Sequence, residues 1–283
     1  MDWHLVRMQL AGQLRSVYMV GVFAMSCVLV GIEYATTYGA SYVVPPSKPT
    51  MLRDVMLFSQ YGSGSGMYLL LLPFLAALLG GGVMASERHA GRLPAIEVRE
   101  GRGRFLSTSM VSGFILGGLG GAMPVLLNLV IAGVRCPHLT FIDGDATDAQ
   151  GNISSDIYVL ISSDSWVYPL YKFNQVLFIV CGLLLVFVIA GLYATVAVGA
   201  SFFVHRKYVE LLVPFVLSLV WWMLPTCTGG LVPDEWSHVI FLDFAPPSRP
   251  VLIQNVVGVV LSIVLLLGIS VVLLCVERRR DAS

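Results

Sequence analysis

Charged residues are scarce in this sequence. Only 12% of its 283 residues are Asp, Glu, Lys or Arg, whereas 57% are hydrophobic. A soluble globular domain has about 25% charged residues, so this chain has too few to cover a surface that faces water. The 17 basic and 17 acidic residues balance, and nothing in this balance points to nucleic acid. We therefore expect a protein whose solvent is mainly lipid.

Several chemical motifs are missing as well. The five cysteines include no C-x-x-C pair and have no metal-ligand spacing with the five histidines. The sequence has no GxxxxGKS/T loop, because the GSGSG at 62–66 is not followed by one. No paired carboxylates, His cluster or nucleophile–base pair falls within an apolar run. We expect a chain that is not catalytic by itself and holds no metal or cofactor.

Long apolar runs fill most of the sequence instead. A helix needs about 20 residues to cross ~30 Å of hydrocarbon. Six runs qualify, at about 17–37, 67–85, 107–134, 175–204, 208–226 and 254–276. Continuous rather than alternating apolar runs favour helices over a β-barrel. The prediction is an all-α membrane protein of six transmembrane helices, with residues 1–283 in a single transmembrane domain.

Basic residues are distributed unevenly around these runs. Twelve of the 17 lie in the segments 1–16, 86–106, 205–207 and 277–283, although the alternate segments are much longer. Because cytoplasmic flanks are enriched in Lys and Arg, we predict that both termini are cytoplasmic. The segments 135–174 and 227–253 are then extracellular.

The N-terminal segment 1–16 has a helical pattern. Its apolar residues recur at helical spacing, at Trp3, Val6, Leu10, Leu14 and Val17. This stripe predicts an interfacial helix, and the alternative is a plain extension of the first span.

Two other segments carry structural signals. The segment 227–253 is polar and broken by prolines, yet its WSHVIFLDF stretch is amphipathic. We expect short helices that dip into the outer membrane face and return, or else an ordinary extracellular loop. The GGLGGAMP stretch at 117–124 predicts close helix packing through small residues.

Polar side chains inside apolar runs are candidates for a functional path. Asn128 either lines a substrate path or hydrogen-bonds a neighbouring helix. Glu33 is expected close to water at the outer end of the first run. The absence of other buried charge argues against an ion- or proton-coupled carrier. Cys136 and Cys227 fall at the outer face, where they could form a disulfide or remain two separate thiols.

One charged stretch interrupts the apolar pattern. Residues 85–105, ASERHAGRLPAIEVREGRGRF, hold eight of the chain's charged side chains. Glycines and Pro94 break the stretch into a short helix between turns. Mixed charges on a short exposed element suit a protein partner, and the alternative is a solvated loop whose arginines only set the topology.

The region 68–118, YLLLLPFLAALLGGGVMASERHAGRLPAIEVREGRGRFLSTSMVSGFILGG, resembles the signature region of ATP-binding-cassette (ABC) transporter permeases of the type-2 exporter superfamily. A small-residue run is followed by an E-R-x-x-G motif, here Glu87, Arg88 and Gly91, then by a short helix with basic residues and the next span. The six-span layout, the N-terminal interfacial helix and a re-entrant element between spans five and six also match that family.

The resemblance implies a permease subunit for ATP-driven export. ATP and Mg²⁺ would be bound by two copies of a separate cytoplasmic ATPase, and the permease would pair with a second copy of itself or a homologous permease. The segment 86–106 would couple the two, through Glu87, Arg88, Gly91, Arg92, Glu97 and Arg99. We expect an amphipathic or apolar substrate, such as a lipid, peptide or drug-like molecule, and a bacterial plasma membrane. The alternative is a membrane scaffold or assembly protein that docks a cytoplasmic partner and transports nothing.

Overall fold

The computed structural model describes residues 3–39, 50–58, 62–89, 91, 102–141, 160–161, 165–203, 208–244 and 252–280. These residues form helices and turns, and none of them lies in a β-strand. Six helices are long and apolar enough to cross a membrane. The prediction of an all-α fold with six helices long and apolar enough to span a membrane is confirmed for these residues.

The candidate spans overlap the six apolar runs. They comprise α2 (Val17–Gly39), α3 (Ser63–Gly80) continued by α4 (Gly82–His89), α6 (Arg102–Arg135), α8 (Gln175–Ala200), α9 (Val209–Cys227) and α11 (Leu252–Arg280). The shorter helices are α1 (Trp3–Leu14), η1 (Met51–Asp54), α7 (Tyr168–Phe173), η2 (Asp234–Trp236) and α10 (His238–Phe241). The third span is the longest of the six candidates.

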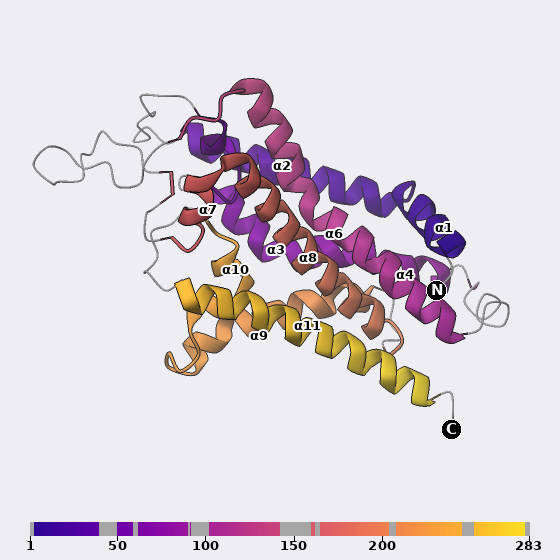
Figure 1. The fold of residues 1–283 in the computed structure, drawn as a ribbon. Coiled ribbons are helices and arrows are strands. Elements are labelled where there is room, and N and C mark those ends of the chain that lie inside the picture. Colours follow the sequence, from indigo (N-terminus) through magenta and orange to yellow (C-terminus); the bar gives the residue numbers. More distant parts are fainter. Residues whose placement is uncertain are drawn as a thin grey trace, which may run out of the picture.

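The long helices lie side by side in a bundle (Figure 1). The start of α1, the end of α11 and α4 lie at one end, which we call the basic end because Arg7 and Arg104 belong to its helices. The opposite end carries α7 and the start of α8, and we call it the capped end.

Small residues let the central helices approach closely. A Cβ atom on Gly117 or Gly121 of α6 would overlap the side chain of Ala194 or Ala190 of α8. A Cβ on Gly80 of α3 would meet the same helix pair. The prediction of close packing at 117–124 is confirmed, and α3, α6 and α8 form the core of the bundle.

The N-terminal helix is separate from the first span. Helix α1 ends at Leu14, and α2 begins at Val17 after a two-residue turn, so α1 is not a plain extension. Its buried face contains Leu5 and Val6, whereas Trp3 of the expected stripe is 68% exposed. The face differs because α1 packs on α6, where Gln9 Nε2 donates to Ser109 Oγ at 3.1 Å.

Candidate functional site

The E-R-x-x-G motif begins in α4. Helix α3 continues into α4 with a single non-helical residue, Gly81, between them. Helix α4 contacts α1 and α6, and Glu87 is half-buried in it at the basic end. The side chain of Arg88 lies outside the described residues, as do Arg92, Glu97 and Arg99. The structure therefore places the start of the predicted coupling segment and leaves the contacts of the other members a prediction.

Gly91, the last residue of the motif, has a defined backbone role. Its φ angle is +67°, in the left-handed region, and it is exposed with open space around it. Helix α4 ends at His89, so Gly91 occupies the position at which helices commonly terminate in this conformation. A residue with a Cβ is strained there, which gives a physical reason for glycine in the motif.

Asn128 of α6 hydrogen-bonds the backbone of η1 and the turn after it at the capped end. Its side chain is fully buried. Its Oδ1 accepts from the Met56 N–H at 2.7 Å, and its Nδ2 donates to the Asp54 carbonyl at 3.0 Å. The amide thus hydrogen-bonds the backbone on both sides of one turn, which is the hydrogen-bonding role that the sequence left open.

Glu33 lies in a different environment from the expected one. It is 1% exposed, not close to water. Its Oε2 accepts from the Ser65 N–H at 2.9 Å, and Thr36 Oγ1 accepts from the Ser63 N–H at 3.0 Å. Two side chains of α2 therefore cap the first turn of α3, where a carboxylate also interacts favourably with the helix dipole. This capping explains why α3 begins within GSGSG, which its composition alone marks as flexible.

Two further carboxylates are buried. Glu210, in the first turn of α9, and Glu277, near the end of α11, are both almost fully buried. The expectation that the spans lack buried charge is wrong, because Glu33, Glu210 and Glu277 all lie within candidate spans. The sequence signal was present but weak, since each residue stands near the end of an apolar run, where exposure is the default expectation.

A cluster of charged and aromatic residues lies close to the Asn128 turn. The Tyr38 hydroxyl donates to the Asp54 carboxylate, with oxygen–oxygen distances of 2.6 and 2.7 Å. The Arg135 guanidinium lies 4.5 Å from the centre of the Tyr38 ring, within the range of a cation–π interaction. These contacts join the ends of α2 and α6 to η1.

Aromatic rings close the capped end. The Phe58 ring lies 4.6 Å from that of Phe178 and 5.7 Å from that of Phe244, measured between centroids. The Phe244 N–H donates to the Leu57 carbonyl at 3.0 Å. The turn after η1, helix α8 and the chain after α10 thus meet in one buried cluster.

The segment between α9 and α11 forms two short helices, η2 and α10. His238, at the start of α10, is fully buried, with Nε2 3.1 Å from the Leu69 carbonyl of α3 and Nδ1 3.2 Å from the Tyr193 hydroxyl of α8. Because a carbonyl oxygen can only accept, Nε2 donates and Nδ1 accepts from Tyr193. Burial lowers the pKa of His238 to about 4, against the opposing effect of the Leu69 carbonyl. His238 is therefore uncharged at neutral pH, and its two hydrogen bonds join α10 to α3 and α8.

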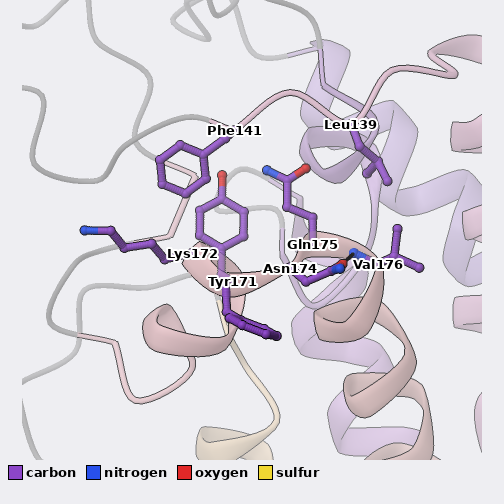
Figure 2. A pocket seen from close by; sticks show the side chains of 8 residues that line it. Leu139, Phe141, Tyr171, Lys172, Asn174, Gln175 and Val176 are labelled. Atoms are coloured by element: carbon purple, nitrogen blue, oxygen red, sulfur yellow. Dashed lines mark hydrogen bonds between the residues drawn. The ribbon is translucent and has the colours of Figure 1, made fainter.

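A shallow surface cavity of about 310 Å³, open to the outside, lies at the junction of α7 and α8 (Figure 2). Leu139, Phe141 and residues 171–176 line it. Sequence reasoning missed this cavity, because its walls come from segments about 30 residues apart that carry no motif.

The five cysteines are free thiols in this structure. Cys136 directly follows α6 and Cys227 ends α9, and the ends of these helices lie on different sides of the bundle (Figure 1). This arrangement agrees with two separate thiols rather than a disulfide. Among the described residues, no group of three or more His, Cys, Asp or Glu side chains could hold a metal ion.

No protein-family model, curated protein or solved structure matches this chain. Its function is therefore argued from the geometry of the bundle and from the motif at its basic end.

Proposed function

We propose that this chain is the membrane-spanning permease subunit of an ATP-driven exporter of the ABC type-2 class. The observation that carries the proposal is α4, a short helix that continues a candidate span and ends at His89, two residues before the left-handed Gly91. It presents the E-R-x-x-G motif at the end of the bundle where the charged segment 86–106 connects two spans. The end of a span that bears charges of both signs, next to the segment that connects it to the following span, is suited to docking a protein that moves the spans.

The same proposal assigns the two ends of the bundle to the two sides of the membrane. The basic end would face the cytoplasm, with both termini there, because the segments predicted to be cytoplasmic hold most of the chain's Lys and Arg. The capped end would face outward, and the short helices η2 and α10 would form the re-entrant element. Two copies of a cytoplasmic ATPase would supply ATP and Mg²⁺, and a second permease chain would complete the transporter.

We propose an amphipathic or apolar substrate. The candidate spans are strongly apolar, and the best-defined buried carboxylate, Glu33, is engaged in capping α3. The Asn128 amide is likewise engaged with backbone groups. Because these polar groups hydrogen-bond within the protein, they stabilise the bundle. The surface that a substrate would then meet is mainly apolar.

The test is purification of the tagged chain in mild detergent from its native membrane. We expect a stoichiometric partner that contains a GxxxxGKS/T loop and hydrolyses ATP. Glu87→Ala and Arg88→Ala should reduce the amount of this partner or uncouple its ATP hydrolysis. Asp234→Ala is the matched control, since Asp234 is exposed in η2, between α9 and α11, and should leave both unchanged. A folded preparation without any ATPase would reject the permease and favour the non-transporting scaffold.

A further inference from the structure

The cavity between α7 and α8 is separate from the proposed ATPase site, and the inference drawn from it does not rest on transport. Its volume of about 310 Å³ is at the lower end of the range for small-molecule sites, roughly 300–1,000 Å³. The rings of Phe141 and Tyr171 stack at 5.1 Å and form one wall. The Tyr171 hydroxyl and the Gln175 amide extend in the same direction beside Phe141 (Figure 2).

The polar side chains that line the cavity include two hydrogen-bond donors, Lys172 and Gln175. Lys172 contributes an exposed ammonium group. The Gln175 Nε2 is shielded from water and has no hydrogen-bond partner. The Asn174 Oδ1 is already engaged, because it accepts from the Val176 and Leu177 N–H groups at 2.9 and 3.1 Å. No acidic side chain belongs to the described residues that line the cavity. A cation and an unpaired amide donor fit an oxygen-rich anion.

An apolar stripe begins at the cavity and runs down α8. Val176 lines the cavity and is 55% exposed, and Val180 and Leu184 follow at 45% and 57%. Residues spaced by four share one helix face, and at 1.5 Å per residue this stripe is about 12 Å long. Helix α8 is one of the candidate membrane spans, so this exposed stripe would face lipid in a membrane. A ligand whose anionic group occupied the cavity could therefore lay an attached hydrocarbon chain along this stripe.

The surroundings of the cavity are those of a membrane interface. Tyr168, Tyr171 and Lys172 precede the first turn of the span, and the Lys172 Nζ lies 5.9 Å from the Tyr168 ring centre. Tyr and Lys side chains commonly anchor span ends at the level of lipid headgroups. We propose that this cavity binds the phosphate headgroup of an anionic phospholipid, with one acyl chain along Val176, Val180 and Leu184.

The experiment uses the purified full-length chain in detergent, titrated with phosphatidylglycerol and followed by native mass spectrometry. We expect Lys172→Ala to weaken binding about fivefold, as for a partly exposed ion pair, and Gln175→Ala to weaken it further in the double variant. Arg7→Ala is the matched control, because Arg7 is an exposed basic residue of α1 at the opposite end of the bundle and should leave the affinity unchanged. Thermal unfolding of each variant shows whether it has folded. If Gln175→Ala does not fold, Lys172→Gln alone decides the result.

Two further ligands distinguish a phospholipid site from a site that binds only an acyl chain or only a free phosphate. A diacylglycerol with the same acyl chains lacks the phosphate and should bind at least about fivefold more weakly. Inorganic phosphate should not displace the phosphatidylglycerol, because it has no chain to occupy the stripe. Equal binding of the diacylglycerol, displacement by inorganic phosphate, or unchanged affinity in the Lys172 variants would each overturn the proposal.

Discussion

Two glycines in the first turns of α3 should respond in opposite ways to the same substitution. Gly64 and Gly66 are two residues apart in one helix. A Cβ on Gly64 would lie 2.7 Å from the Leu29 carbonyl oxygen and 2.8 Å from the Glu33 Cβ, whereas a Cβ on Gly66 would meet nothing within 4 Å. Gly64→Ala therefore pushes α3 away from α2, and Gly66→Ala changes only the helix propensity.

The magnitudes follow from these distances. Overpacking of a tight site costs about 1–3 kcal/mol, and here it also lengthens the bond from the Ser65 N–H to Glu33. Replacing an exposed helix glycine by alanine stabilises by about 0.5–1 kcal/mol. We expect the free energies of unfolding of the two variants to differ by about 2–4 kcal/mol, which corresponds to roughly 5–10 °C in Tm.

The assay is fluorescence-detected thermal unfolding of the detergent-solubilised chain. Wild type, Gly64→Ala and Gly66→Ala should unfold in the order Gly64→Ala first and Gly66→Ala last. If both variants shift Tm in the same direction by similar amounts, α3 does not approach α2 at Glu33 as closely as the structure shows, and the capping argument is wrong.

Other substitutions test the remaining contacts. Gly91→Ala should destabilise the end of α4 by about 1–2 kcal/mol, which is the cost of a Cβ at positive φ. Protease sensitivity at residues 86–106 should therefore rise. Gly103→Ala is the control, because a Cβ there meets open space, and it should not raise the protease sensitivity. Asn128→Ala should lower the free energy of unfolding by about 2–5 kcal/mol, because two buried backbone groups lose their partner, and the loss should appear as a lower Tm. Asn128→Asp should not restore the hydrogen bond that the Asn128 amide donates to the Asp54 carbonyl. His238 should stabilise the fold above pH 6.5, and this stabilisation should be lost as the pH falls toward 4, because the unfolded state binds the proton more readily. The loss in the free energy of unfolding is at most ~3 kcal/mol. His238→Gln should flatten this pH dependence of Tm.

The bundle itself was predictable from the sequence. Each span is an apolar run longer than any run in a soluble core, and the lack of water in a bilayer leaves helix as the available structure. Close packing at 117–124 was predictable for a related reason, since glycines and alanines in an apolar helix serve helix contacts. These conclusions depend on local composition, which a single sequence contains.

The helix boundaries were less predictable where another helix supplies the cap. The second span was expected to begin at residue 67, but α3 begins at Ser63. Glycine and serine have low helix propensity, and the turn is helical because Glu33 and Thr36 accept its backbone N–H groups. The same contact removes Glu33 from water. One interaction between α2 and α3 therefore accounts for both discrepancies.

The capped end could not be predicted because its bonds join residues far apart in the chain. The partners of Asn128 are 72 and 74 residues away, and those of His238 are 45 and 169 residues away. Periodicity and motifs describe neighbours within a few turns, so they carry no information on such pairs. The basic end differs, since its E-R-x-x-G motif is local and its glycine ends the helix that contains Glu87. The sequence therefore predicts this helix end, whereas the long-range bonds that close the other end of the bundle are seen only in the structure.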